Sequence, residues 1–155
     1  MRRLLACLLI LFLVSEAIAS AAVRGKKVMY VGGTISTLSE KTEGVLNLAE
    51  SSAVFTAKSG TKLAIPYGKI ESLEYGQKAG RRVGAAVVVS PLFLFSKKRK
   101  HFLTIGFEDE AGKKQGGVFE LAKGIVRETL STLETKSGKK VEYESDEARK
   151  HAQGH

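Results

Sequence analysis

The clearest pattern in this sequence is the run Phe102-Leu103-Thr104-Ile105-Gly106-Phe107-Glu108. Leu103, Ile105 and Phe107 recur at every second position, and this period of two places them on one face of a β-strand. A turn follows at residues 109–112, and Gly117–Leu121 then becomes apolar again. We therefore predict an antiparallel hairpin here and a sheet built mainly from antiparallel strands.

Strand patterns also precede this hairpin. Val28–Ile35 is dominated by β-branched and aromatic residues, which favour strands, and Gly32-Gly33 within it indicates a bulge or bend. A second hairpin is expected around the turn Ser59-Gly60-Thr61, with Leu63, Ile65 and Tyr67 on one face of its returning strand. Further extended segments are predicted at 44–48, 53–58 and 69–77.

One amphipathic helix is predicted near the C-terminus, at Ala122–Lys136. Its apolar residues fall three and four positions apart and form one stripe, at Ile125, Val126, Thr129, Leu130 and Leu133. Gly138 suits the left-handed position that ends a helix. The predicted fold is therefore mainly β with one C-terminal helix: a curved antiparallel sheet, or partly open barrel, with the helix over one open end.

The first residues have the features of a secretory signal peptide. Met1-Arg2-Arg3 precedes eleven apolar residues, Leu4–Val14, and small residues follow. This apolar run is too short to span a bilayer as a helix. We predict cleavage after Ala19, with a site after Ala21 as the alternative, or else an uncleaved N-terminal anchor or a buried first helix.

These patterns divide the chain into a signal peptide at 1–19, one β-rich domain at 27–143 and a polar, disordered tail at 144–155. Cleavage would remove the only cysteine, so the mature fold has neither a disulfide nor thiol chemistry. We expect an exported protein that is periplasmic or secreted.

The predicted body resembles the pleckstrin-homology-like fold, in particular GRAM-type domains in a family of uncharacterised exported bacterial proteins. The resemblance covers about residues 27–143, and the segments that carry it are Leu63–Tyr67, Ile70–Tyr75, Lys97–Ile105 and Val118–Lys140. It implies a module that binds lipid headgroups, peptides or proteins. Residues 37–41, in the first hairpin region, hold one Lys and one Glu, whereas lipid-binding members carry a basic motif there, which argues against phosphoinositide binding.

The chemically unusual segment is 81–100. Thirteen uncharged residues, Val83–Phe95, lie between two groups of cations. The candidate binding residues share either positive charge or apolar bulk: Arg81, Arg82, Leu92, Phe93, Leu94, Phe95, Lys97, Lys98, Arg99 and Lys100. Cations are attracted to anionic membranes, and large apolar side chains are costly to leave in water.

Three interpretations of this segment remain open. It is a core strand or short helix with solvated basic ends, a loop that enters the interface of an anionic bilayer, or a docking surface for a partner protein. Solvent exposure of Leu92–Phe95 would separate the first interpretation from the other two.

Enzyme signatures are missing from the sequence. Neither a Gly-x-Ser-x-Gly nor a His-Glu-x-x-His motif occurs, and no phosphate-binding glycine loop is present. The formal charge of +9 does not by itself indicate nucleic-acid binding, because no aromatic residue interrupts the basic run Lys97–Lys100. We expect His101 to be structural, and we expect no cofactor, metal or nucleic acid.

The sequence therefore predicts a non-catalytic exported binding module that acts at the cell envelope. Its partner is an anionic membrane surface, reached through residues 81–100, or an envelope protein. The alternative is a protein-interaction or structural domain in which residues 83–95 are buried as core.

Overall fold

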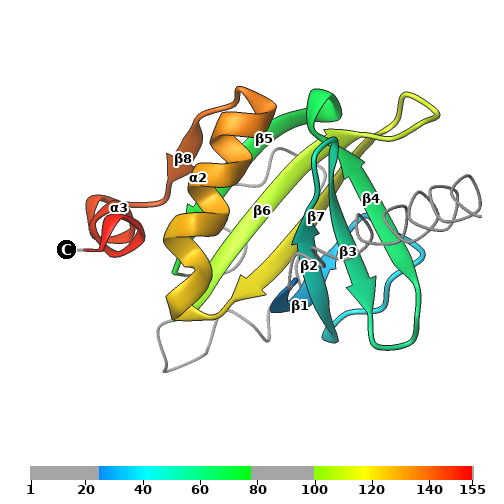
Figure 1. The fold of residues 1–155 in the computed structure, drawn as a ribbon, viewed down its shortest axis with the longest axis horizontal. Coiled ribbons are helices and arrows are strands. Elements are labelled where there is room, and N and C mark those ends of the chain that lie inside the picture. Colours follow the sequence, from blue (N-terminus) through cyan, green and yellow to red (C-terminus); the bar gives the residue numbers. More distant parts are fainter. Residues whose placement is uncertain (1–24, 78–99, 155) are drawn as a thin grey trace, which may run out of the picture.

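The computed structural model describes residues 25–77 and 100–154, and one curved, open sheet of eight strands forms most of this part (Figure 1). The strand order in the sheet is β4-β3-β2-β1-β7-β6-β5-β8. The strands are β1 (Lys26–Gly33), β2 (Thr42–Leu48), β3 (Ser52–Ala57), β4 (Lys62–Pro66), β5 (Ile70–Gly76), β6 (His101–Glu108), β7 (Lys114–Leu121) and β8 (Val141–Tyr143). The helices are the short η1 (Tyr67–Lys69) and η3 (Lys123–Ile125), then α2 (Val126–Ser137) and α3 (Asp146–Gln153).

The predicted fold class is confirmed, with one correction to the sheet. Strands β1 to β4 form an antiparallel meander, β5 to β7 form another, and β1 pairs with β7 to join them. An antiparallel sheet was predicted, but strand β8 runs parallel to β5. The sheet is therefore mixed. A parallel neighbour needs a crossover connection, and the chain supplies one through α2.

The bulge predicted at Gly32-Gly33 is present in β1. The register with β7 shifts between Tyr30 and Gly32, and Gly33 then pairs with Gly117. Gly33 has a φ of 151°, and a Cβ atom there would lie 2.1 Å from the carbonyl oxygen of Gly116. Glycine is therefore required at this junction between the two meanders.

Helix α2 crosses one face of the sheet, here called the inner face, and the main core lies between them (Figure 1). Its buried residues are Val126, Thr129, Leu130 and Leu133, which belong to the predicted stripe. The helix proper begins at Val126 because Lys123–Ile125 forms the 3-10 turn η3 instead. Gly138 ends the helix in the left-handed conformation, with φ 69°, as predicted.

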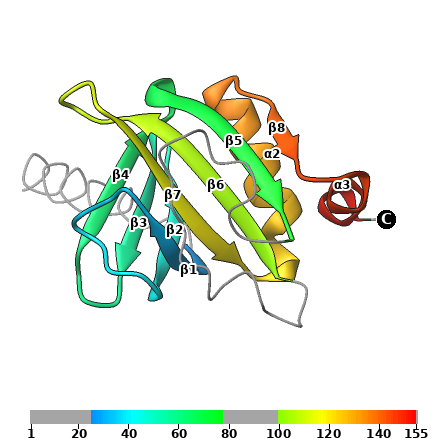
Figure 2. The same cartoon turned by 180° about the vertical axis from the view of Figure 1, so that it is seen from behind.

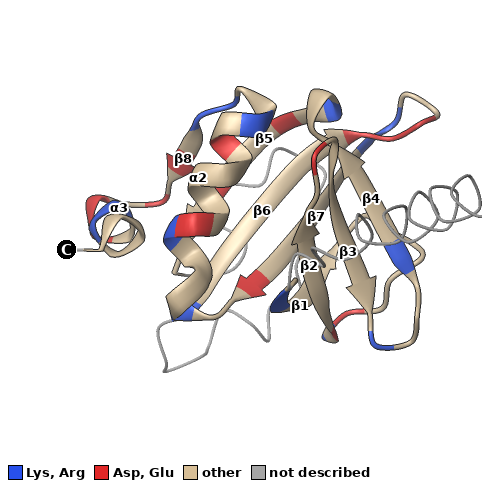
Figure 3. Cartoon of the chain, viewed as in Figure 1, with Lys and Arg blue, Asp and Glu red and all other residues tan. Residues whose placement is uncertain are grey.

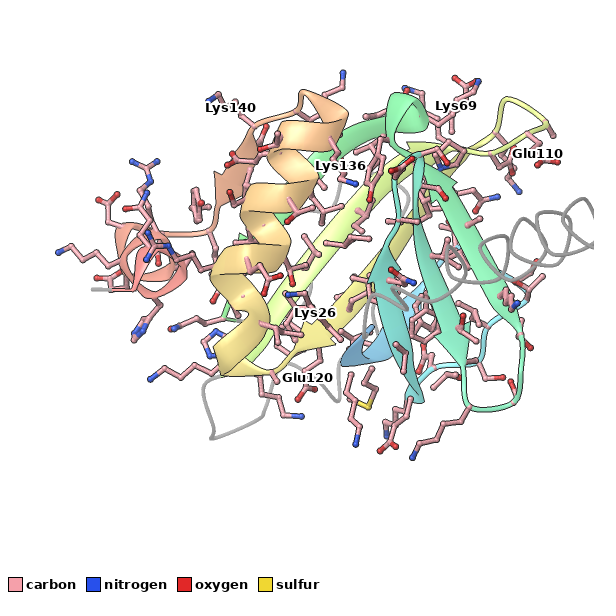
Figure 4. All side chains as sticks on the ribbon, viewed as in Figure 1. Lys26, Lys69, Glu110, Glu120, Lys136 and Lys140 are labelled. Carbon is pink, nitrogen blue, oxygen red and sulfur yellow. The ribbon has the colours of Figure 1, made fainter. Side chains whose placement is uncertain are left out.

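The C-terminal end of α2 also reaches the meander on the far side of the core. The Lys136 ammonium donates a hydrogen bond to the carbonyl oxygen of Ala49 at 2.7 Å and lies 5.3 Å from the centre of the Tyr67 ring. Figure 4 shows Lys136 directed from the helix toward η1. The helix thereby contacts residues of both meanders.

The expectation of a disordered tail at 144–155 was wrong for residues 146–153, which form α3. The Ser145 hydroxyl accepts a hydrogen bond from the backbone N–H of Ala148 at 3.1 Å, and Asp146 and Glu147 lie in the first turn. Both features stabilise a helix N-terminus. Ala148 and Ala152 are buried within the main core, so the packed body extends beyond the predicted boundary at 143.

The second face of the sheet, here called the outer face, is also partly apolar. Leu103, Ile105 and Phe107 share the inner face as predicted, but Phe102 and Val118 on the other face are 3% and 0% exposed. Neither belongs to the core cluster under α2. Strands buried on both faces read as nearly continuous apolar runs, which explains why the alternation is imperfect here. Figure 2 shows this outer face, with α2 behind the sheet.

Candidate functional site

Nine of the ten predicted binding residues, those between 81 and 99, lie outside the described residues. Lys100 is described, immediately before β6. Its ammonium group lies 2.8 Å from a carboxylate oxygen of Glu120 on β7, and both side chains are partly exposed. Within the described part of the chain, the charge of Lys100 is therefore balanced by a carboxylate of the outer face.

A groove of about 580 Å³ lies on the outer face beside Glu120. It is lined by side chains of four strands that are adjacent in the sheet: Lys27 and Met29 of β1, Glu43 and Val45 of β2, Lys58 after β3, and Glu120 of β7. The register explains their meeting, because Lys27 pairs with Val45 while Met29 pairs with both Glu43 and Glu120. Directly opposed residues in a sheet share a face.

The floor of the groove is apolar. Met29 and Val45 alternate along their strands with Val28, Tyr30 and Leu46, which are buried under α2, so these two side chains point outward. Val45 is 37% exposed and is the one exposed large hydrophobic residue among the residues described. An open apolar floor within a concave surface is the usual form of a binding site.

The rim of the groove carries charges of both signs, and its two acidic groups are engaged. Lys58 donates a hydrogen bond to Glu43, and this bond, with the charge of the same lysine, lowers the pKa of the Glu43 carboxyl. Glu120 is paired with Lys100. Basic and acidic positions are interspersed over the described elements in Figure 3, and Figure 4 places Glu120 and Lys26 at the same end of the molecule.

A second polar feature lies on the inner face, at the ends of β5 and β6. The Tyr75 hydroxyl and Nδ1 of His101 are 2.5 Å apart, and the two rings are stacked with an angle of 12° between their planes. Burial raises the pKa of Tyr75 to about 12. Burial, followed by the charges of His151 and Lys123, lowers the pKa of His101.

This pair has the properties of a structural contact. At neutral pH a phenol with so high a pKa holds its proton, and the imidazole is neutral, so the hydrogen bond joins two uncharged groups. His101 was expected to be structural, and its observed hydrogen-bond partner is a phenol. The pairing could not be found from the sequence, because residues 26 positions apart meet only through the strand register.

The groove was missed by the sequence analysis for the same reason. One signal was present: Val28-Met29-Tyr30-Val31 is apolar at four consecutive positions, which predicts a strand with apolar groups on both faces. That signal predicts that the outer face of β1 is apolar, but it does not show which side chains of neighbouring strands line the groove.

The described residues form neither a metal-binding cluster nor a membrane-spanning helix. Within residues 25–77 and 100–154, no group of three or more His, Cys, Asp or Glu side chains is arranged to hold a metal ion. No helix in the same ranges is both long and apolar enough to cross a bilayer.

A scan against models of known protein families and a search of curated proteins both return no match to this chain.

Proposed function

We propose that this protein is a non-catalytic exported binding module that acts at the cell envelope and holds apolar side chains of a partner protein in the outer-face groove. The observation that carries this proposal is the groove itself: about 580 Å³, with Met29 and the exposed Val45 as its floor. Binding pockets commonly range from about 300 to 1,000 Å³ and combine an apolar floor with a few polar groups.

The charges of the rim favour a polypeptide over an anionic headgroup. Glu43 and Glu120 form ion pairs with Lys58 and Lys100, so the rim presents charges of both signs and not the purely basic surface that an anionic headgroup requires. A polypeptide can bury apolar side chains on the floor while its own polar groups meet charges of either sign at the rim.

The groove is tested with an anilinonaphthalene sulfonate dye, which reports accessible apolar surface by its fluorescence. We expect the native protein to bind the dye, and Val45→Asp to reduce binding at least about tenfold, because a carboxylate on the floor replaces the apolar contact. Ala64→Asp is the matched control: residue 64 is exposed on β4, outside the lining of the groove.

Equal dye binding by the native protein and Val45→Asp would contradict the groove as a binding site. Thermal unfolding of each variant is recorded alongside, because a loosened core also binds such dyes. The comparison is valid only between variants with one cooperative transition.

The sequence supports a second partner, an anionic membrane surface reached through residues 81–100. Each cation near such a surface contributes about 1 kcal/mol, and six cations flank the uncharged stretch. We expect co-sedimentation with phosphatidylglycerol vesicles at low salt and its loss when Arg81, Arg82, Lys97 and Lys98 are all changed to Gln.

Four exposed lysines elsewhere provide the control for this change, at equal loss of charge: Lys62, Lys113, Lys139 and Lys140. If the native protein does not sediment with anionic vesicles at low salt, the membrane proposal is wrong and the protein-binding proposal stands alone.

The resemblance to pleckstrin-homology-like domains remains a proposal. It is supported by the strand-rich body and by the helix that follows β7 and covers the inner face. A shared fold of this kind does not choose among lipid, peptide and protein partners.

A further inference from the structure

Two consecutive lysines at the start of β1 lie on opposite faces of the sheet. Lys26 is on the inner side, where its ammonium group forms an ion pair with Glu128 of α2 and its side chain is 15% exposed. Lys27 is exposed and lines the outer-face groove, because successive side chains of a strand alternate between faces. The groove therefore receives a cation that the core side does not use.

The register of the sheet arranges the charged and apolar residues of the groove in two rows across the strands. In the first row, Met29 lies between Glu120 of β7 and Glu43 of β2, the two acidic residues of the lining. In the second row, Lys27 lies directly opposite Val45. The neighbour of Lys27 on β2 is therefore the exposed apolar residue of the floor and not a carboxylate.

Lys27 has no carboxylate partner within the described residues. The two carboxylates of the first row are paired with other lysines, Glu43 with Lys58 and Glu120 with Lys100. Over residues 25–77 and 100–154, none of the ion pairs involves Lys27. The groove thus holds a positive charge in excess, and this charge lies beside the apolar floor.

We propose that the partner segment held in the groove carries an aspartate or glutamate beside its large apolar side chain, and that Lys27 binds this carboxylate. The inference rests on the proposed function of the groove and adds the chemistry by which the partner is recognised. The acidic side chain supplies the counter-charge of Lys27, while its apolar neighbour covers Val45 and Met29.

The charge of the whole chain favours the same partner. Its formal charge is +9, so an acidic polypeptide is attracted before contact, whereas a basic one is repelled. The first row limits how acidic the segment can be, because further carboxylates at the Met29 end would meet the like charges of Glu43 and Glu120. The fitting partner is an apolar segment with an acidic residue at one end, and not a polyanion.

Two dyes separate the charge of the groove from its apolar floor: anilinonaphthalene sulfonate is an anion, and Nile red is uncharged. We expect Lys27→Gln to weaken binding of the anionic dye about twofold to fivefold, the effect of one exposed ion pair, and to leave Nile red binding unchanged. Val45→Asp should weaken binding of both dyes. Lys62→Gln is the matched control, because Lys62 is an exposed lysine of β4 outside the lining of the groove.

A random peptide library selected on the full chain tests the partner itself. We expect enrichment of peptides in which Asp or Glu lies within about two positions of a large apolar residue, since side chains that share a face of an extended segment are two positions apart. On Lys27→Glu, the enriched residue at that position should change from acidic to Lys or Arg. A purely structural role of Lys27 would not produce such a swap, and Lys62→Glu should select the same peptides as the native protein.

The outcomes distinguish this inference from the proposed function. Apolar peptides that need Val45 but show no acidic preference, or that keep the preference on Lys27→Glu, would overturn the inference and leave the groove as the binding site. Equal losses of anionic-dye binding in Lys27→Gln and Lys62→Gln would also overturn it, because general charge would then attract the anion. Binding that Val45→Asp does not change, or a library without enriched peptides, would contradict the groove itself.

Discussion

Two residues define the chemistry of the inner face. Tyr75 is 1% exposed and His101 is 8% exposed, and the Tyr75 hydroxyl shares a hydrogen bond with Nδ1 of His101. A buried polar group without a partner costs about 1–3 kcal/mol, so neither side chain is readily replaced alone. Because both pKa values are displaced by folding, the pair makes the free energy of unfolding depend on pH.

His101 and Tyr75 make the free energy of unfolding change with pH in opposite directions. Folding lowers the pKa of His101 from 6.5, so its contribution is present above pH 6.5 and is lost as the pH falls below that value. Folding raises the pKa of Tyr75 from 10.0 to about 12, so its contribution is present below pH 10 and is lost between pH 10 and pH 12. We expect a plateau of stability between these limbs.

The substitution Tyr75→Phe tests the alkaline limb. The stability difference between the native protein and this variant should shrink by about 2–3 kcal/mol from pH 10 to pH 12, because the phenol of the native sequence ionises in the unfolded chain before it ionises in the folded one. Urea unfolding at each pH gives the values. Parallel curves for the two proteins would show that Tyr75 is not the responsible group.

At the scale of elements, the stability of α2 depends on the backbone conformation at each of its ends. Gly138 follows the helix with φ 69°, a conformation that costs other residues about 1–2 kcal/mol. Gly124, in η3 before the helix, does not have a positive φ, and a Cβ atom there would meet nothing within 4 Å. The two glycines therefore have different roles.

Alanine at these two positions provides a matched pair of variants. Gly138→Ala should lower the free energy of unfolding by about 1 kcal/mol, and Gly124→Ala should leave it unchanged or raise it by about 0.5 kcal/mol. Thermal and urea unfolding measure both. A larger loss in Gly124→Ala than in Gly138→Ala would contradict the assignment of Gly138 as the helix end.

The elements were predictable where local pattern and packing agree. The β6–β7 hairpin, the bulge in β1 and the stripe of α2 follow from spacing and glycine placement alone. Helix α3 did not, because two alanines make too weak a stripe to separate a docked helix from a polar tail. The groove and the Tyr75–His101 pair depend on register between distant strands, which a single sequence does not specify.

At the scale of the whole molecule, the sheet depends on the junction between its two meanders. Thr34 strengthens the β1–β7 pairing just beyond Gly33: its backbone N–H donates to the carbonyl oxygen of Gly116 at 2.9 Å, and its hydroxyl lies 2.6 Å from the Gln115 side-chain oxygen. The close approach at Gly33 leaves no room for a side chain.

Gly33→Ala should therefore destabilise the entire described body. We expect a loss of about 2–4 kcal/mol, because the added methyl group collides with backbone that cannot move without breaking the pairing. Gly68→Ala, where a Cβ atom would have nothing within 4 Å, should be close to neutral. A calorimetric scan that shows equal melting temperatures for both variants would contradict this account of the junction.

The pairing of the first strand with the seventh also sets the order of events in folding. Met29 of β1 lies opposite Glu120 of β7. Strand β1 therefore gains its second neighbouring strand only when most of the chain has been synthesised. Proteins with such distant contacts fold slowly, since the ends of a long loop must meet before any stabilisation is gained. The eight-stranded sheet therefore cannot be complete until β7 has left the ribosome, although the pairs among β1 to β4 join only strands that are neighbours in sequence.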